Sequence, residues 1–248
     1  MNRKVAIIGA GAAGCFAAAC LRDCIVDVYE AAPKPLAKVA VTGGGRCNIT
    51  NSFASVRSVK EVYPRGYSLM KRALKEFSPS DTLGWFEDAG VGGFAAPDTD
   101  GCIFPNSQDA NEIVRVLLAA MSRSGARLHT GKALVRLHPP VLSGDTPLHP
   151  PVLLGGKPLY PPVLSDDNPS FSASSSAALS PLAPGGVHPS AGPWRLEFAD
   201  GSTAEADVVL VPRCLCGDAV QCVRHLVAIV VVGDEGLQSS FYVFVEAL

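Results

Sequence analysis

The stretch KVAIIGAGAAG, residues 4–14, decides how this chain folds. Residues 4–8 form a short apolar run without alternation, which is typical of a strand buried on both faces of a parallel sheet. The glycines that follow match G-x-G-x-x-G, and residues 12–21 have the alanine content of a tightly packed helix. A second apolar run, residues 25–29, predicts the next strand. The order strand, glycine turn, helix and strand predicts a βαβ unit in an α/β, Rossmann-like domain with a parallel sheet.

The three glycines of this turn have separate tasks in a dinucleotide site. Gly9 allows the tight turn, Gly11 lets a pyrophosphate approach the backbone, and Gly14 lets the helix pack closely on the strand. The start of the helix, at Ala12 and Ala13, offers unpaired N–H groups and the positive end of a dipole to the phosphates. A glycine pattern alone is a weak signal, but here it lies between a predicted strand and a predicted helix.

Glu30 supplies the acidic residue that such a unit requires. It ends the second predicted strand, about twenty residues after the turn, where a carboxylate accepts hydrogen bonds from ribose hydroxyls. The competing interpretation is a secretory signal, because residues 2–4 are polar and basic and an apolar run follows them. A signal peptide has no need of the downstream acid, so we favour the dinucleotide site. The motif itself does not separate FAD from NAD.

A second glycine-rich loop, VTGGGRCNITN at residues 41–51, follows soon after this acid. Three consecutive glycines expose backbone N–H groups that can donate hydrogen bonds to a bound anion. Arg46 adds a permanent positive charge, and Asn48, Thr50 and Asn51 add neutral donors. Such a loop can reach the second phosphate and the edge of a flavin, although an ordinary glycine loop with a surface arginine is the alternative.

Residues 43–51 resemble the GGGRCNxTN signature of a family of FAD-dependent flavoproteins described as NAD(P)/FAD-dependent oxidoreductases or aminoacetone-oxidase-like proteins. This family includes proteins assigned to bile-acid dehydroxylation. Residues 100–107, DGCIFPNS, are similar to the family's G-R-x-F-P-x-S segment, with Cys102 where the family usually has a charged or polar residue. Residues 206–210 are similar to the strand before the family's A-T-G-G turn. The resemblance covers residues 4–137 and 194–211.

The resemblance implies a cofactor, FAD, and residues that bind it. Gly9, Gly11 and Gly14 would bind the pyrophosphate, Glu30 the adenosine ribose, and the backbone of Leu134 the adenine. The second loop would lie along the pyrophosphate, the ribityl chain and the flavin. The residues of that loop are Gly43, Gly44, Gly45, Arg46, Cys47 and Asn48.

The chain also departs from the family's pattern. The A-T-G-G turn is absent, since Leu210 is followed by VPRCLC at residues 211–216. Family members continue into a substrate-side domain and a final segment that returns to the flavin, neither of which is recognisable here. Residues 212–248 therefore form a divergent tail, and we expect it to have no regular place in the family's fold.

A proline-rich segment interrupts the resemblance. Residues 138–170 are three copies of an eleven-residue unit, HPPVLSGDTPL, HPPVLLGGKPL and YPPVLSDDNPS, and a Ser/Ala/Pro/Gly-rich stretch continues to residue 193. Dense proline removes backbone donors and blocks helices, so we expect a disordered insert of polyproline-II character. A docking site for a protein partner is the alternative. The predicted organisation is a first part of the FAD-binding domain at 1–137, this insert at 138–193, a returning hairpin at 194–211 and the tail at 212–248.

The remaining expected elements surround this frame. Residues 69–77 and 80–89 read as amphipathic helices, the second with Ser80 or Asp81 as its N-cap and Gly90 as its C-cap. Residues 109–124 predict another helix, and 127–137 a strand. Residues 194–198 and 204–211 flank Asp200-Gly201, a strong hairpin signal, and the strand ending at Val211 should re-enter the core sheet.

Composition places further limits on function. The net charge of −2 gives no attraction to nucleic acid or to anionic membrane, and no apolar run reaches the length of a bilayer span. Eight cysteines lie inside apolar runs rather than at framework spacing, so we expect reduced thiols and a cytoplasmic protein. The close set of Cys214, Cys216, Cys222 and His225 lacks the spacing of structural zinc sites, so we predict no metal.

The sequence supports two hypotheses of different classes. The first is an FAD-dependent oxidoreductase that acts on a small-molecule substrate. Because no second G-x-G-x-x-G exists, any NAD(P)H would visit the flavin transiently. The second is a truncated, non-catalytic remnant that binds a dinucleotide weakly or not at all. No general acid or base can be named: His129 reads as a strand residue, and Cys47 has no C-x-x-C partner, so we expect a packed cysteine.

Overall fold

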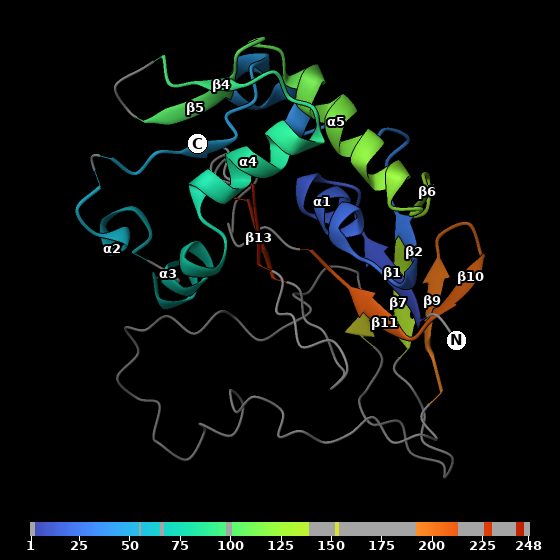
Figure 1. Ribbon diagram of the computed structural model, residues 1–248. Coiled ribbons are helices and arrows are strands. Elements are labelled where there is room, and N and C mark those ends of the chain that lie inside the picture. Colours follow the sequence, from blue (N-terminus) through green and yellow to red (C-terminus); the bar gives the residue numbers. More distant parts are fainter. Residues whose placement is uncertain are drawn as a thin grey trace, which may run out of the picture.

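The computed structural model describes residues 3–54, 56–64, 67–97, 101–138, 152–153, 192–212, 226–229 and 242–245. A parallel sheet in the strand order β11-β1-β2-β6 lies at the centre of the fold (Figure 1). Its strands are β1 (Arg3–Ile8), β2 (Cys24–Tyr29), β6 (Arg127–His129) and β11 (Val208–Leu210). The α-helices are α1 (Ala12–Cys20), α2 (Val59–Val62), α3 (Tyr67–Glu76), α4 (Pro79–Ala89) and α5 (Ala110–Arg123).

The predicted βαβ unit is confirmed. β1 and β2 pair in parallel along their whole length, from Arg3 opposite Cys24 to Ile8 opposite Tyr29, and α1 connects them. Each of the three elements agrees with its predicted range to within one residue at either end. β11 pairs in parallel with β1 on the other side, so the chain returns to the core sheet as expected.

The side chains of β1 alternate between two cores. Val5 and Ile7 are buried in the core that contains residues of α1 and α5, whereas Ala6 is buried in a second core on the opposite face. Figure 1 shows α1 and α5 beside each other on the first face. Burial of a large aliphatic side chain stabilises a fold by roughly 1.5–3 kcal/mol, and this is why a strand buried on both faces reads as a continuous apolar run.

A second, antiparallel sheet covers the other face, in the order β10-β9-β7-β8. Its strands are β7 (Leu134–His138), β8 (Val152–Leu153), β9 (Trp194–Phe198) and β10 (Thr203–Ala206). The predicted hairpin is confirmed: β9 and β10 pair antiparallel, and Gly201 in the turn has φ +80°. Leu196 and Phe198 of this sheet pack in the second core with Ala6, which fixes the sheet against β1.

Two predicted strands are each divided between the two sheets, so the prediction of single strands was wrong. In 127–137 the chain turns at Gly131, which has φ +68°. The N–H of the next residue, Lys132, donates to the Glu30 carbonyl. In 204–211 the chain changes sheets at Asp207, whose carboxylate accepts the N–H of Lys4 at 2.7 Å. A period-2 pattern can continue through such a crossing, so alternation alone does not mark the division, and Gly131 was the one local turn signal within 127–137.

The predicted helices are confirmed, but α4 begins earlier than expected. Its N-cap is Ser78, not Ser80 or Asp81. The Ser78 side chain accepts the N–H of Asp81, and the Asp81 carboxylate accepts the N–H of Ser78 at 2.7 Å, which is a capping box with Pro79 in the first turn. Gly90 ends the helix in the left-handed region with φ +117°, as predicted.

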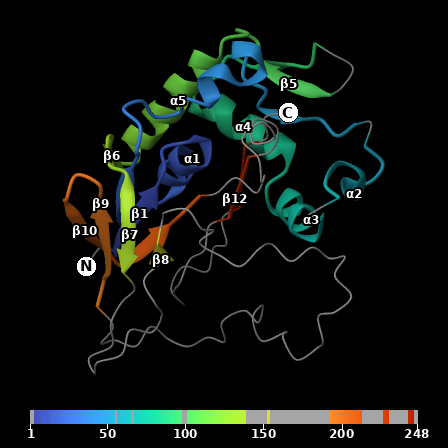
Figure 2. The same ribbon diagram turned by 180° about the vertical axis from the view of Figure 1, so that it is seen from behind.

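Short elements complete the described part of the fold. A small sheet in the order β3-β5-β4 lies beside the start of α5, where Figure 2 labels β5. Its strands are β3 (Thr50–Asn51), β4 (Phe94–Ala95) and β5 (Cys102–Pro105), and the 3-10 helix η1 (Val39–Gly45) precedes it. In the tail, β12 (Leu226–Ile229) pairs with β13 (Tyr242–Val245).

Most of the predicted insert and tail lies outside the described residues. Within 138–193, His138 ends β7 and β8 pairs with β7. Cys214, Cys216, Cys222 and His225 also lie outside the described residues. The division of the chain into four parts stays a prediction. Within the ranges given above, no helix combines the length and the apolar character needed to cross a membrane.

A cluster of charges joins β2 to β6 and makes stability depend on pH. Asp27 accepts hydrogen bonds from Arg127 at 2.6 and 2.9 Å and lies 2.7 Å from His129. Burial alone would raise the pKa of Asp27, but the hydrogen bonds from Arg127 and His129 outweigh it and hold this pKa below its ordinary value. A carboxylate with a lowered folded-state pKa stabilises the fold above its unfolded pKa, and this contribution disappears as pH falls through the folded pKa.

Asp27→Asn should therefore destabilise the chain at pH 7, and the difference from wild type should shrink as the pH falls below about 4. Urea unfolding of both proteins at pH 7 and pH 3 measures this. Asp88→Asn, on the exposed side of α4, is a matched control that should show little difference at either pH. A pH-independent difference for Asp27→Asn would contradict the stabilising role of the charge.

Candidate functional site

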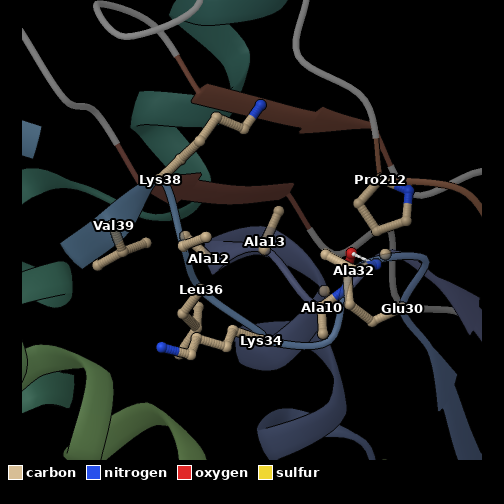
Figure 3. A pocket seen from close by; sticks show the side chains of 14 residues that line it. Ala10, Ala12, Ala13, Glu30, Ala32, Lys34, Leu36, Lys38, Val39 and Pro212 are labelled. Carbon is tan, nitrogen blue, oxygen red and sulfur yellow. Dashed lines mark hydrogen bonds between the residues drawn. The ribbon is translucent and has the colours of Figure 1, made fainter. Parts of the chain in front are cut away.

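A cavity of about 410 Å³ opens at the start of α1. Figure 3 shows the side chains around it. Its walls come from the glycine turn, the first turn of α1, the end of β2 and the segment that follows β2. The lining residues are Gly9, Ala10, Gly11, Ala12, Ala13, Gly14, Glu30, Ala32, Lys34, Leu36, Ala37, Lys38, Val39 and Pro212. Six of the residues predicted to bind the cofactor thus lie together: Gly9, Gly11, Ala12, Ala13, Gly14 and Glu30.

The glycine turn adopts the geometry that its sequence predicts. Gly9 has φ +102°, a conformation that side chains disfavour, and its N–H bonds to the Tyr29 carbonyl at 2.7 Å. Gly11 is the N-cap of α1, and its carbonyl accepts the first helical hydrogen bond from Cys15. A Cβ at Gly11 would meet nothing within 4 Å, so the backbone there is open to the cavity. Ala12 and Ala13, in the first turn of α1, also line the cavity.

Gly14 is required for packing. A Cβ built at this position would lie 1.9 Å from the carbonyl oxygen of Gly9, which is backbone and cannot move aside. It would also lie 3.4 Å from Cγ2 of Ile7 in β1. The close approach of α1 to β1 thus depends on the missing side chain, in agreement with the role predicted for this glycine.

Glu30 points back toward the start of α1. One carboxylate oxygen accepts the N–H of Ala10 at 2.7 Å, and the other accepts the N–H of Ala32 at 2.8 Å (Figure 3). The backbone of Glu30 is held by His129 and Lys132, both at 2.8 Å. An ionised carboxylate has about four acceptor positions, so capacity for ribose hydroxyls remains.

The segment after Glu30 also lines the cavity, and the sequence-based prediction missed it. Leu36 is 2% exposed and its N–H bonds to the carbonyl of Ala10 at 2.8 Å, which fixes the segment across the glycine turn. Lys34, Lys38 and Val39 reach the cavity from this segment. The sequence of this segment has no hydrophobic periodicity. Only its position directly after Glu30 in the chain could have indicated that it lines the cavity.

The second glycine loop adopts a left-handed backbone at its three glycines and does not line the cavity. Gly43, Gly44 and Gly45 have φ of +58°, +68° and +85°. A Cβ at Gly43 would lie 2.8 Å from the backbone nitrogen of Asn48. The Arg46 guanidinium lies 4.2 Å from the ring centre of Phe104 in β5. Glycine is therefore required here by the fold, whatever the loop binds.

Two polar side chains of this loop are buried without a hydrogen-bond partner among the described residues. Asn48 is 1% exposed and Thr42 is 5% exposed. Neither atom of the Asn48 amide makes a hydrogen bond in the described part of the chain, and the same holds for the Thr42 hydroxyl. Buried polar atoms are nearly always paired in native proteins. These side chains therefore fit a polar cofactor group or water that the described residues do not supply.

Cys47 is a packed cysteine, as predicted. It is fully buried, and burial raises the pKa of its thiol to about 12. Cys15, Cys20, Cys24, Cys47 and Cys102 are the free cysteines of the described ranges. Since the thiolate is the reactive form, Cys47 lacks the properties of a redox thiol.

Iodoacetamide at pH 8 should leave Cys47 unmodified in the folded chain, because almost none of it is thiolate and none of it is exposed. Peptide mass spectrometry measures this, with the partly exposed Cys24 as the internal comparison and the urea-unfolded chain as the fully reactive reference. Alkylation of Cys47 as fast as that of Cys24 would show that the loop opens readily.

The other candidate residues do not reach the cavity. Leu134 lies in β7 and packs in the second core, so its predicted contact with an adenine stays a prediction. His129 is a strand residue paired with Asp27, as expected. Across the described parts of the chain no group of three or more histidine, cysteine, aspartate or glutamate side chains could hold a metal ion.

The sequence model of the HI0933-like protein Rossmann domain matches residues 3–139, more than half of the chain. This chain belongs to the HI0933-like family. The matched range contains β1, α1, β2 and every residue predicted to bind the cofactor. The Rossmann-like fold predicted from the glycine turn is therefore confirmed at the level of the family.

Relatives of this HI0933-like chain include an enzyme. It is 31% identical over 135 residues to the 3-dehydro-bile acid delta(4,6)-reductase of Clostridium scindens, a match that covers 53% of this chain and 31% of the relative. The chain therefore spans less than a third of the length of that relative.

Solved structures with detectable similarity are distant. THI4 of Thermovibrio ammonificans has a TM-score of 0.31 at 16% identity, covering 54% of this chain and 42% of that one. The amino acid oxidase NikD in its open form has a TM-score of 0.34 at 15% identity, covering 89% and 53%. These scores are too low to extend the assignment, which rests on the strand order and on the family match.

Proposed function

We propose that this HI0933-like chain binds the ADP half of FAD at the start of α1 and serves a flavin-dependent oxidoreductase reaction on a small molecule. The observation that carries the proposal is the shared cavity of an open glycine turn, a helix N-terminus and Glu30. Anions are stabilised at helix N-termini, and carboxylates at this position accept ribose hydroxyls. The reductase activity in the name of the Clostridium relative supports the reaction class.

The choice of FAD over NAD rests on the second glycine loop. Residues 43–51 match the GGGRCNxTN signature of the aminoacetone-oxidase-like flavoproteins, to which we assign the chain within its family. We place the loop along the pyrophosphate, the ribityl chain and the flavin, and Leu134 beside the adenine. The amide of Asn48 and the hydroxyl of Thr42, which have no hydrogen-bond partner within the described ranges, support a polar group at this loop.

In this proposal the residues of the chain bind and orient. The N–H groups at Ala12 and Ala13 neutralise the diphosphate, Glu30 holds the ribose, and Gly11 leaves room for both. A bound flavin supplies hydride or electron transfer, and the protein contributes its position and its electrostatic surroundings. Any NAD(P)H would act as a transient partner. We further propose a cytoplasmic location, which the free thiols of the described cysteines support.

The second candidate is a protein that binds a dinucleotide without turnover. Pro212 favours it, because this residue lines the cavity at the end of β11, where the flavoprotein pattern has the A-T-G-G turn. Proline has no N–H to donate and its ring fills space that a glycine would leave open. In this case the ADP half would bind while the flavin would lack its usual support.

A visible absorption spectrum separates the two candidates. The purified chain should be incubated with FAD, freed of unbound cofactor by gel filtration, and titrated with NADPH or dithionite. Bands of bound flavin that bleach on reduction support the oxidoreductase. A colourless protein that still binds ADP supports the second candidate, and a protein that binds neither contradicts both.

A further inference from the structure

A second cavity, of about 450 Å³, lies where three helices end. Its walls come from the C-terminal halves of α1, α4 and α5 and from residues that follow α1 and α5. The lining residues are Ala19, Arg22, Trp85, Asp88, Ala89, Ala120, Arg123 and Ser124. None of them lines the cavity at the start of α1. The two cavities therefore lie at opposite ends of this helix, and the second is separate from the proposed cofactor site.

Hydrogen bonds to the helix ends hold two guanidinium groups at the wall of this second cavity. Nη1 of Arg22 donates to the carbonyls of Ala19 and Leu21, at 2.7 and 2.9 Å. Nη2 of Arg123 donates to the carbonyl of Ala89 at 3.4 Å. Ala19 and Ala89 are themselves lining residues, so both guanidinium groups lie at the cavity.

Each guanidinium keeps donors that these bonds do not use. Arginine has five N–H groups in a planar fork, and the bonds above engage one nitrogen of each side chain. In the described part of the chain, neither Arg22 nor Arg123 forms an ion pair with a carboxylate, and Asp88, the acidic lining residue, forms none with a cation. The cavity thus has more positive than negative charge and offers donors to an anion.

Trp85 adds a flat apolar surface to the same cavity. Its ring packs on the rings of Phe16 and Phe86, with ring centres 4.4 and 5.0 Å apart. The side chain is only half-buried, so part of the indole remains open on the cavity side. The face or edge of a ligand ring can pack against an indole held in this way.

Arginines near helix C-termini also have an ordinary role, because they donate to the last carbonyls and oppose the helix dipole. That role accounts for the bonded nitrogen of Arg22 and of Arg123. It requires neither a shared cavity nor an aromatic wall. Ligand sites typically combine an apolar surface with a few polar groups that fix orientation, and this cavity has both.

We propose that this cavity binds a small aromatic carboxylate, with its carboxylate at Arg22 and Arg123 and its ring against Trp85. Planar guanidinium groups match the geometry of a carboxylate. The charge of Asp88 disfavours a second negative charge on the ligand, so a monoanion fits best. The inference does not rest on the proposed function, since it concerns a different cavity.

Benzoate and benzamide, which share a ring and differ in charge, test the assignment on the whole chain. The chain has two tryptophans, so Trp194→Phe leaves Trp85 as the one source of tryptophan fluorescence. In this background benzoate should change the Trp85 emission saturably at constant ionic strength, and benzamide should bind at least about tenfold more weakly. Arg22→Gln and Arg123→Gln should each weaken benzoate binding about three- to tenfold and change benzamide binding less than about twofold.

Asp88→Asn should act in the opposite direction and strengthen benzoate binding about two- to threefold, which damage to the fold would not do. Arg72→Gln is the matched control, because Arg72 is an exposed arginine of α3 that lines neither cavity. It should leave benzoate binding unchanged.

Three results would overturn the proposal: no saturable response to benzoate, equal affinity for benzoate and benzamide, or benzoate affinity that survives the loss of Arg22 or of Arg123. The arginines would then be helix caps alone. The absorption spectrum with FAD concerns the other cavity, so each of these results leaves the proposed function standing.

Discussion

Gly14→Ala should unfold the βαβ unit or prevent it from forming, with a loss of about 3 kcal/mol or more in the free energy of unfolding. The added methyl group would lie 1.9 Å from the Gly9 carbonyl oxygen, so either α1 must move away from β1 or the glycine turn must open. Both movements disturb the packing of Val5 and Ile7 in the core that they form with residues of α1 and α5. Urea denaturation followed by circular dichroism measures the loss.

Gly84→Ala is the matched control for this variant. Gly84 lies inside α4, and a Cβ there would meet nothing within 4 Å. Alanine is the better helix former, so this change should stabilise the chain by about 0.5–1 kcal/mol. A Gly14→Ala protein with wild-type stability would contradict the close packing of α1 on β1.

Glu30→Ala should lower the affinity for ADP about a hundredfold and destabilise the chain by about 2 kcal/mol. The carboxylate is the acceptor for the N–H groups of Ala10 and Ala32, and its removal leaves both without that partner and releases the turn. A ribose would lose its acceptor at the same time. The ADP affinity and the stability of Glu30→Gln should lie between those of wild type and Glu30→Ala, because the glutamine amide keeps one acceptor oxygen.

Calorimetric titration with ADP and with adenosine measures this effect, and both ligands should lose affinity because both carry the ribose. Glu76→Ala, which removes an exposed carboxylate in α3, is the control and should leave binding and stability nearly unchanged. If Glu30→Ala folds as wild type does and binds ADP with unchanged affinity, the carboxylate does not hold the ribose.

The core of the site could be predicted because its residues are close in sequence and each has a specific physical task. Gly9 requires a left-handed conformation and Gly14 requires a close contact, and only glycine satisfies either without cost. The burial of β1 on both faces follows from its apolar run. These constraints are local, so the sequence displays them directly.

Other parts of the site depend on contacts that are distant in sequence. Pro212 lines the cavity because β11 pairs with β1, although about two hundred residues separate them. Leu36 crosses the glycine turn through one backbone hydrogen bond, which leaves no pattern in side-chain types. The division of 127–137 at Gly131 was missed for a related reason, because a strand that leaves one sheet for another can keep its alternation.

The most direct test of the central claim is a crystal structure of the chain with ADP bound. The account predicts the diphosphate within hydrogen-bonding distance of the N–H groups at Ala12 and Ala13, and the ribose hydroxyls on the carboxylate of Glu30. A nucleotide bound elsewhere on the chain, or one whose ribose lies away from Glu30, would contradict it.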